Sequence, residues 1–417
     1  MKKKILIKAP LLSRSGYGEQ SRFALRAVRS REDLFDIYIV NLPWGGTGQI
    51  AENTEESRFI KDCLQKTVMY GQSGGQFDIS LQITVPNEFE RIAPVNIGYT
   101  AGMETTRVSG QWIEKCNNFV DKVIVISNHS KKVFEQTKYD VQDQNGNQVK
   151  DWGIQVPIEV INYPVRDAEP EEVDIEFTTT QNYLAVAQWG IRKNLDNTIK
   201  WFVEEFKDNE DVGLVVKTNT VSDSIMDREH TIYRLQALLA SVPDRKCKIY
   251  LLHGEVTPGH LTWLYTHPTM KALINIGHGE GFGLPLFEAA YNGLPLITVT
   301  WSGQMDFMCT TNKKGKQVPR IIKVDYDLKP VQKEAVWEHV IEAESMWAYA
   351  KENSYKRALR ESLEKEKHYK KEATVLRNHI RRNFVAEDLY KQFVSYIYDP
   401  SPEELEWLEE MGDIQIL

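Results

Sequence analysis

Short runs of apolar residues alternate with amphipathic segments along most of the 417-residue chain. Within the runs, apolar and polar positions do not alternate strictly, which is typical of strands in parallel sheets that helices cover on both faces. The pattern therefore predicts an α/β fold. Helices are expected between several strands, for example at 20–29 and 111–119. The predicted strands are residues 5–8, 37–40, 79–83, 95–99, 123–126, 183–187, 213–217, 248–252, 272–276 and 296–299.

The strands fall into two series, and residues 163–180 separate them. This segment contains Pro164, Pro170 and an acidic run, a composition typical of a linker. The length of the chain also suits two domains rather than one core. We expect one α/β domain at 1–165, a second at 166–385, and a C-terminal helix with an acidic tail at 386–417 that packs back toward the first domain.

Beyond Asp327 the sequence is predicted to become helical and highly charged. Residues 351–382 hold eleven Lys or Arg and five Glu, whereas residues 399–417 hold seven acidic residues and no basic one. We interpret most of these charges as solvated helix faces followed by a solvated tail. Residues 142–150, with Asn-Gly in their centre, are expected to form an exposed turn or the tip of a hairpin.

Composition narrows the class of protein. Hydrophobic residues make up 41% and charged residues 26% of the chain, which excludes a mostly disordered protein. The formal net charge of −8 argues against a general polyanion binder but leaves room for a local basic patch. The cysteines lie far apart without a CxxC pair, which argues against a disulfide scaffold or a cysteine zinc site.

The chain is expected to be soluble and cytoplasmic. No segment approaches the roughly 18 apolar residues that a membrane span needs. The start, MKKKILIKAPLL, has the basic and then apolar character of a secretion signal, but Lys8 and Pro10 interrupt its apolar run. The widely spaced cysteines fit a reducing compartment.

The most informative segment is GHGEGFGLPLFE at 277–288, which follows the predicted strand 272–276. Its glycines permit a tight backbone and the close approach of a ligand. Pro285 suits the start of a helix, and Gly293 suits its left-handed exit. The loop therefore directs a helix N-terminus toward the carboxyl end of the strand, which is a favourable place for a phosphate group.

Two carboxylates flank this turn, Glu280 within the loop and Glu288 early in the helix. An ionised carboxylate only accepts hydrogen bonds and pairs well with the adjacent hydroxyls of a sugar. The two are therefore predicted to grip two sugars on either side of a diphosphate. Either residue alone is better explained by solvation or by the helix dipole, so the prediction rests on the whole constellation.

The segment EGFGLPLFE at 280–288, with the following AAxxGxP, resembles the signature of retaining family-4-type glycosyltransferases of the GT-B fold. The resemblance implies two facing Rossmann-like domains, with a nucleoside diphosphate sugar held mainly by the C-terminal one. It implies that Glu280 contacts the transferred sugar and Glu288 the nucleotide ribose. The rest of this part of the donor site would be Gly281 and the backbone of Phe282, Gly283 and Leu284.

Other segments follow the order of that family. Residues 188–194, QWGIRKN, resemble the strand exit that binds the donor diphosphate, where Lys193 would stabilise the departing group. The family often has an arginine where this chain has Gln188, and whether Arg192 replaces it stays open. Further donor contacts are expected from Lys217, His253, Ser302 and Gly303. For Lys217 the alternative is an exposed strand end, and for His253 a packed histidine.

In the first domain, the resemblance implies a surface that borders the acceptor. The loop SRSGYGE at 13–19 follows the first strand, at the place of the family's glycine-rich loop, although such loops are common. Ser127 and Asn128 are expected to cap a helix that begins near Ser130. The residues expected on the acceptor side are Gly16, Tyr17, Gly18, Glu104 and His129, the last with a plain surface position as its alternative.

The main hypothesis is a retaining hexosyl- or pentosyltransferase that uses a UDP-, GDP- or ADP-sugar and needs no cofactor. Its catalytic residues are predicted to be Lys193, Glu280 and Arg192. No metal site is predicted, because the family is metal-independent. Asp325-Tyr326-Asp327 is a DxD motif, the type of motif that binds manganese in the other major glycosyltransferase fold. Here it lies too late in the chain and is interpreted as incidental.

The acceptor and the class of protein stay open. The acceptor hydroxyl can belong to a glycan, a metabolite or another biopolymer, and the basic segment 351–382 keeps a modified DNA base as an alternative acceptor. Three further classes compete with the transferase: a sugar-nucleotide epimerase, a phosphorylase and a non-catalytic glycosyltransferase-like binding protein. The sequence does not name the donor or the oligomeric state.

Overall fold

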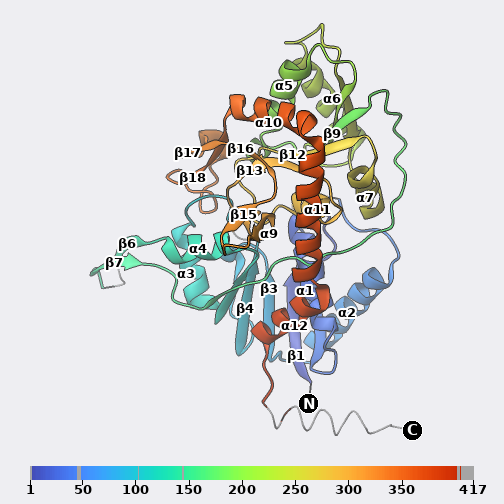
Figure 1. Cartoon of the computed structure of the whole chain (residues 1–417). Helices are drawn as coiled ribbons and strands as arrows, with labels where there is room; N and C mark the ends of the chain where they lie inside the picture. Colours follow the sequence, from blue (N-terminus) through green and yellow to red (C-terminus); the bar gives the residue numbers. More distant parts are fainter. Residues whose placement is uncertain (1, 45–47, 102, 143–144, 402–403, 405–417) are drawn as a thin grey trace.

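The computed structural model describes residues 2–44, 48–101, 103–142, 145–401 and 404. Two parallel six-stranded sheets lie in two lobes, one above the other in Figure 1, and helices pack on both. The α/β prediction is confirmed, and every predicted strand coincides with a strand of one of the two sheets.

The first lobe is built from the N-terminal part of the chain. Its elements are β1 (Lys3–Ala9), α1 (Gly16–Arg29), β2 (Phe35–Asn41), α2 (Glu55–Gln72), β3 (Ile79–Ile83), η1 (Pro86–Glu88), β4 (Val95–Thr100), α3 (Gly110–Phe119), β5 (Lys122–Val125), α4 (Asn128–Gln136) and β8 (Ile158–Val160). The strand order is β2-β1-β3-β4-β5-β8, and neighbouring strands are parallel. The helix predicted near Ser130 begins at Asn128, with Ser127 as its cap.

The second lobe repeats this architecture. Its sheet and helices are β9 (Gln181–Val186), η2 (Ile191–Lys193), α5 (Leu195–Phe206), β10 (Val212–Thr218), α6 (Ile225–Leu239), β11 (Lys248–His253), α7 (Pro258–Thr266), β12 (Met270–Asn275), α8 (Leu284–Tyr291), β13 (Leu296–Val299), α9 (Met305–Met308) and β16 (Ile322–Val324). The strand order is β11-β10-β9-β12-β13-β16, again parallel. The edge strands β8 and β16 escaped prediction because three residues are too short for a pattern.

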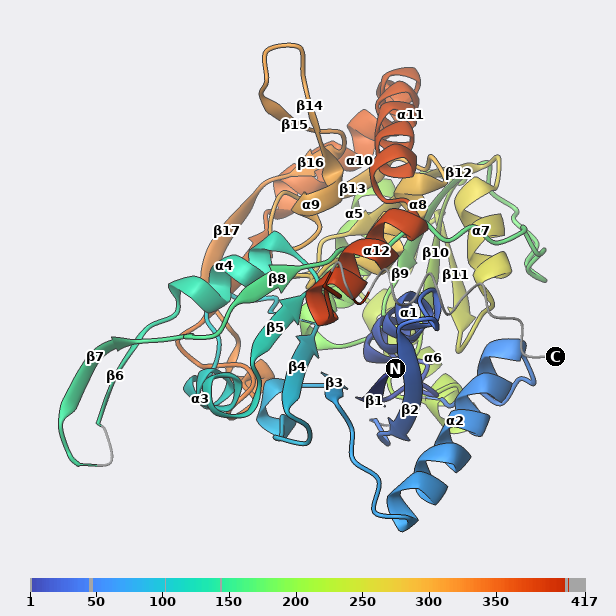
Figure 2. The ribbon, with the colours of Figure 1, turned by 90° about the horizontal axis from the view of Figure 1, so that it is seen from below.

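In the described part of the chain, three antiparallel hairpins form two-stranded sheets separate from the two large ones. The turn predicted at 142–150 joins β6 (Tyr139–Gln142) to β7 (Gln148–Trp152), and its residues 143–144 lie outside the described part of the chain. A second hairpin is β14 (Cys309–Thr311) with β15 (Gln317–Pro319). Figure 2 shows the first two hairpins projecting from the body of the protein. The third is β17 (Tyr326–Pro330) with β18 (Met346–Ala350), and η3 (Lys333–Ala335) lies between its strands.

The prediction that the chain becomes helical beyond Asp327 is therefore wrong for residues 327–350. This segment has Pro330 in its first strand, where proline suits an extended edge, and the aromatic residues Trp347 and Tyr349 in its second. Helical structure resumes at α10 (Glu352–Glu364), where the charged amphipathic pattern starts.

The chain passes between the lobes at residues 161–180, which are irregular, and again from α11 (Glu366–Asn383) to α12 (Ala386–Ile397). Helix α12 packs on α1 of the first lobe (Figure 1). The rings of Phe393 and Phe23 lie 5.4 Å apart at this contact. Most of the predicted acidic tail, residues 402–403 and 405–417, lies outside the described residues.

Much of the positive charge at 351–382 is neutralised within the protein. Ion pairs join Lys356 to Glu204 at 2.6 Å and Arg360 to Glu205 at 2.7 Å, and thereby fix α10 on α5. Of the helices in the described part of the chain, none combines the length and apolar character needed to cross a bilayer.

Candidate donor-sugar site between the lobes

The loop between β12 and α8 lies at the carboxyl end of the second sheet and contacts the first lobe. Gly283 caps α8 with a φ of +89°, and Gly293 leaves the helix with a φ of +86°. Both angles lie in the left-handed region that favours glycine, as predicted for Gly293. The ring of Phe282 packs in the core, 5.1 Å from the ring of Phe287. Phe282 therefore contributes its backbone, and not its side chain, to the surface of the loop. Leu284, the first residue of α8, is half-buried.

Glu280 lies at the centre of a buried ion cluster. Its carboxylate accepts hydrogen bonds from Nζ of Lys193 at 2.6 and 2.7 Å, from Arg192 at 3.3 Å and from Nδ2 of Asn275 at 3.0 Å. Burial by itself would raise the pKa of this carboxyl, but the charges of Lys193 and Arg192 outweigh it and hold the pKa at about 2. Glu280 is therefore ionised at neutral pH.

Arg192 links this cluster to the first lobe. Its guanidinium lies 3.3 Å from Oε2 of Glu280 and 3.3 Å from Oε1 of Glu104, which follows β4. It also donates to the carbonyl oxygen of Gly279 at 2.7 Å. Burial, and then the charge of Arg192, lower the pKa of Lys193 below its ordinary value. The structure thus brings together the three predicted catalytic residues and one predicted acceptor-side residue.

Glu288 also lies at the boundary between the lobes, in an opposite electrostatic environment. It accepts a hydrogen bond from the hydroxyl of Tyr265 at 3.0 Å. Burial, assisted by the charge of Glu19 on α1, raises the pKa of Glu288 to about 7, although Tyr265 and Lys217 act against this shift. Of the two acids that flank the turn, Glu280 is therefore ionised at neutral pH, whereas Glu288 changes its charge near neutral pH.

Two residues with expected donor contacts lie at the carboxyl ends of neighbouring strands. Lys217 is half-buried in β10, and burial lowers its pKa, with Glu255 and Glu288 as the nearby carboxylates. The side chain of His253 in β11 is 5% exposed, and its Nε2 lies 2.8 Å from Oδ2 of Asp227. His253 is therefore a packed histidine with a buried partner, and its contact with the donor stays a prediction.

The glycines of the loop serve the contact between the lobes. A Cβ at Gly279 would collide with the carbonyl oxygen of Glu104, and a Cβ at Gly281 would lie 2.6 Å from that of Ala101. Both oxygens belong to the first lobe. The sequence predicted that these glycines admit a ligand, whereas at these two positions it is the backbone of the facing lobe that requires glycine. Donor contact at Gly281 stays a prediction.

Ser302 and Gly303 hold the Glu280 loop in place. The Ser302 hydroxyl accepts a hydrogen bond from the N–H of Glu280 at 2.8 Å, and the N–H of Gly303 donates to the carbonyl of Glu280 at 2.9 Å. A Cβ at Gly303 would collide with the carbonyl of Gly281. These two groups, expected to contact the donor, are thus already engaged within the protein and position Glu280.

The loop after β1 faces the same boundary from the first lobe. The hydroxyl of Tyr17 lies 2.9 Å from Oγ1 of Thr100 at the end of β4. Gly18 is required by close packing, because a Cβ there would collide with the carbonyl of Ser13. At Gly16, by contrast, no described atom lies within 4 Å of a Cβ, so this glycine borders open space.

His129 is half-buried between the lobes, not exposed on the surface. Its Nε2 lies 3.1 Å from the carbonyl oxygen of Thr105, and its ring lies 4.9 Å from that of Trp301 in the second lobe. Burial lowers the pKa of His129 to about 4. A neutral imidazole therefore faces the boundary at physiological pH.

Two further links between the lobes carry no signal in the sequence. Oδ2 of Asp306, on α9, accepts hydrogen bonds from the N–H of Asn128 at 2.9 Å and from Nδ2 of Asn162 at 2.9 Å. Arg14, in the loop after β1, lies 2.7 Å from Glu255 after β11. These partners are far apart along the chain, and no local pattern marks them.

Two sequence features lie apart from the cluster. Gln188 is exposed and donates to the carbonyl of Thr220 at 2.9 Å, while Arg192 reaches Glu280. Asp325 and Asp327 form ordinary ion pairs, the first with Arg357 at 3.0 Å and the second with Lys351 at 2.8 Å.

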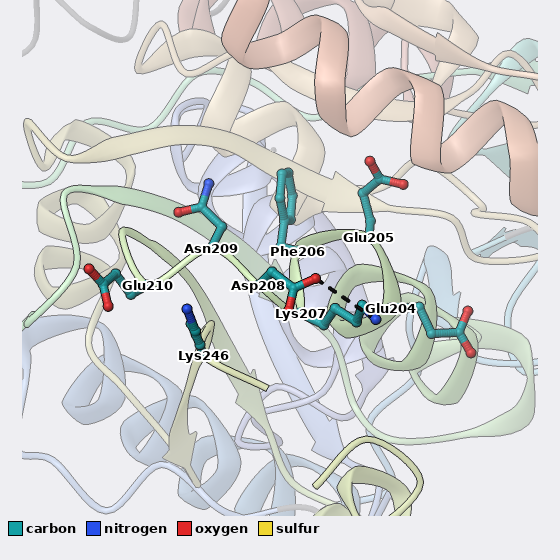
Figure 3. A pocket seen from close by; sticks show the side chains of 8 residues that line it. All are labelled: Glu204, Glu205, Phe206, Lys207, Asp208, Asn209, Glu210 and Lys246. Atoms are coloured by element: carbon teal, nitrogen blue, oxygen red, sulfur yellow. Dashed lines mark ion pairs between the residues drawn. The ribbon is translucent and has the colours of Figure 1, made fainter. Parts of the chain in front are cut away.

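A separate surface hollow lies at the carboxyl end of α5 (Figure 3). Charged side chains surround it, including Glu204, Glu210 and Lys246, and an ion pair joins Lys207 to Asp208 at 3.8 Å. The hollow borders the amino end of β10. Parallel α/β sheets bind ligands at the carboxyl ends of their strands, so this hollow is not the candidate site.

Comparison with known proteins identifies the fold. No family model matches the sequence, and no curated protein matches it. Among solved structures, sucrose-phosphate synthase from Thermosynechococcus elongatus is 12% identical, with a TM-score of 0.61 over 95% of this chain and 98% of that one. A glycosyltransferase from Rickettsia africae is 12% identical, with a TM-score of 0.57 over 99% of this chain and 100% of that one.

HepE from Anabaena, in complex with UDP-glucose, is 9% identical and has a TM-score of 0.55 over 94% of this chain and 99% of that one. The chain spans only 55% of the length of a TarM mutant from S. aureus, to which it is 14% identical over 77% of its own length, with a TM-score of 0.48. The chain has the GT-B fold of the glycosyltransferases.

Proposed function

We propose that the chain is a retaining glycosyltransferase that moves a sugar from a nucleoside diphosphate sugar to an acceptor hydroxyl. The observation that carries the proposal is the cluster of Arg192, Lys193 and Glu280 at the carboxyl end of the second sheet, opposite Glu104 of the facing lobe. Two adjacent cations suit a diphosphate, and an ionised carboxylate beside them suits sugar hydroxyls. The complex of HepE with UDP-glucose, on the same fold, supports a donor of this class.

The reaction breaks the bond between the anomeric carbon and the diphosphate oxygen, through an oxocarbenium-like transition state. A new bond forms between that carbon and the acceptor oxygen on the same face of the sugar, and the acceptor proton passes to the leaving diphosphate. Negative charge grows on the diphosphate, where Lys193 and Arg192 would stabilise it. A well-placed donor of this kind contributes about 3–4 kcal/mol. The mechanism needs no metal ion and no further cofactor.

Binding of a donor requires an exchange of partners. The phosphate oxygens replace the carboxylates of Glu104 and Glu280 as partners of Arg192 and Lys193. The Glu280 carboxylate then accepts hydrogen bonds from the hydroxyls of the transferred sugar. Asn275 also donates to the Glu280 carboxylate, and the Ser302 hydroxyl accepts from the backbone N–H of Glu280, so the carboxylate keeps its place when the cations shift. Glu288 is assigned to the ribose hydroxyls, with Lys217 beside it.

The first test is thermal unfolding in the presence of UDP-, GDP-, ADP- and TDP-sugars. A donor that binds only the folded protein raises the melting temperature, by an amount that grows with its concentration. We expect one nucleotide to raise it clearly more than the others. NMR of the product with that donor then reports retention at the anomeric carbon. Conversion of the sugar nucleotide without an acceptor would assign an epimerase instead, and no shift with any donor would contradict the proposal.

A further inference from the structure

The hairpin of β14 and β15 is an ordered basic arm. Figure 2 shows it extending from the body of the protein beside α11. Its tip is held by Asn312, whose Oδ1 accepts hydrogen bonds from the N–H groups of Lys314 at 2.9 Å and Lys316 at 3.0 Å. Gly315 completes the turn with a φ of +74°, which favours glycine. The tip is therefore a defined turn that presents its lysines to solvent.

The positive charge of this arm stands out in an acidic chain. Residues 309–320 contain four Lys or Arg and no Asp or Glu, whereas the chain has a net charge of −8. Arg320, at the base of the arm, is neutralised by Glu372 at 2.7 Å. Lys313, Lys314 and Lys316 at the tip are exposed, and within the described part of the chain none of them has an ion-pair partner.

The arm begins at the boundary between the lobes. Cys309, its first residue, follows α9 directly, and α9 carries the Asp306 carboxylate that accepts hydrogen bonds from Asn128 and Asn162 of the first lobe. Ser302, a few residues earlier, holds the backbone of Glu280. The base of the arm therefore lies next to the junction between the lobes, where the candidate site is found.

We propose that this arm binds duplex DNA and that the acceptor hydroxyl is carried by a DNA base. The major groove admits a two-stranded β-ribbon, and lysines at its tip would pair with the phosphates. The tip from Asn312 to Gln317 holds no large apolar side chain, which argues against insertion into a membrane. Unmodified bases carry no hydroxyl in the major groove, so the acceptor class is a hydroxymethylated pyrimidine.

The identity of the acceptor rests on the proposed function, whereas the binding of DNA does not. In the transfer, the anomeric carbon leaves the diphosphate oxygen and bonds to the hydroxymethyl oxygen of the base. The proton of that hydroxyl passes to the diphosphate, so the reaction needs no other reactant.

Fluorescence anisotropy of the full chain with a labelled 20-base-pair duplex, between 50 and 200 mM NaCl, tests the arm. The variant K313Q/K314Q/K316Q is compared with K61Q/K246Q/K248Q, which removes the same charge from exposed lysines outside the arm. We expect the arm variant to bind at least about tenfold more weakly at low salt, with a log–log salt slope shallower by about 2–3, because each phosphate contact contributes roughly one unit. The control should bind within about twofold of wild type.

Equal weakening in both variants would overturn the role of the arm, as would binding of wild type to dextran sulfate or to phosphatidylserine vesicles without binding to DNA. A donor-induced rise in melting temperature, measured in parallel, should be the same in the arm variant as in wild type. Its absence from wild type would contradict the glycosyltransferase while leaving the DNA result intact. Two results, with protein that shows the donor shift, would overturn the acceptor: no transfer to either a hydroxymethylcytosine or a hydroxymethyluracil duplex, or equal transfer to the unmodified duplex.

Discussion

Lys193 and Glu280 form a buried ion pair in which Nζ lies 2.6 Å from Oε1. The pair joins the loop after β9 to the loop after β12, two segments that only the folded sheet makes adjacent. A buried ion is costly without its partner, because the protein cannot replace the water that it has lost. The pair therefore ties the stability of this region to the same groups that are assigned to donor binding.

Replacing Lys193 with alanine is expected to lower kcat by about 10²–10³-fold, since it removes a cation from the leaving diphosphate. It should also lower the free energy of unfolding by about 2–4 kcal/mol, because Glu280 loses its nearest counter-charge and keeps only Arg192 and Asn275. Steady-state kinetics and urea denaturation measure the two effects.

The double variant Lys193→Met/Glu280→Gln separates the effect on turnover from the effect on stability. Because it removes both charges, it should recover most of the stability without recovering turnover. Lys271→Ala is the matched control. Lys271 also pairs with a glutamate, Glu366 at 2.9 Å, but away from the cluster, so kcat should be unchanged. Near-normal turnover of Lys193→Ala would refute the catalytic assignment.

The low pKa of Glu280 makes its contribution to stability dependent on pH. Its pKa of about 2 lies below the ordinary value of 4.5, so the stabilisation is fully present above pH 4.5 and is lost as the pH falls toward 2. The shift corresponds to at most about 3 kcal/mol. Glu280→Gln should therefore be less stable than wild type at pH 7, and the difference in free energy of unfolding should shrink between pH 4.5 and 2. A difference that does not change over that range would show that the carboxylate is not held by its cations.

Glu288 is expected to behave in the opposite way. Its pKa of about 7 lies above the ordinary 4.5, so its ionisation destabilises the fold; the cost is absent below pH 4.5, grows up to pH 7 and is constant above. Glu288→Gln should be more stable than wild type at pH 8, by up to about 3 kcal/mol, and equally stable at pH 4. Thermal unfolding from pH 4 to 8 measures this. A variant that is less stable at pH 8 would place Glu288 in a favourable ion pair instead.

The pKa of Glu288 also predicts how donor binding depends on pH. An ionised Glu288 accepts hydrogen bonds from both ribose hydroxyls, whereas its protonated form loses part of that capacity. Donor affinity of wild type should therefore rise between pH 6 and 8, and that of Glu288→Gln should stay flat. Isothermal titration calorimetry at several pH values gives both curves, and parallel curves would remove Glu288 from the ribose site.

The contact between Gly279 and the carbonyl of Glu104 predicts that the lobes cannot close around a larger residue. Gly279→Ala should lower kcat/KM by about tenfold or more, because misplacement of the facing groups by about 1 Å costs orders of magnitude in rate. Small-angle scattering should show a larger radius of gyration. Gly71→Ala, within α2 and away from the site, is the control, since no described atom lies within 4 Å of a Cβ at that position. Equal activity of both variants would mean that this contact does not limit closure.

The arrangement of the strands and the turn before α8 follow from local sequence. Apolar runs such as 213–217 have few alternatives to a buried parallel strand, and they appear within the strands of the structure. Gly293 takes the left-handed conformation that its position after the helix indicated, because this conformation is decided by the few residues around the turn. The three-residue edge strands, and the hairpin at 326–350, carried too little pattern to be assigned.

What the tertiary structure decided is which groups meet. By itself the sequence determined two α/β halves and a loop with two acids. Only the folded lobes make Gly279 and Gly281 necessary for contact with Glu104 and Ala101, and only they give Glu280 and Glu288 opposite pKa shifts. The reason is physical: backbone conformation depends on near neighbours along the chain, whereas desolvation and ion pairing depend on distances between segments that the chain leaves far apart.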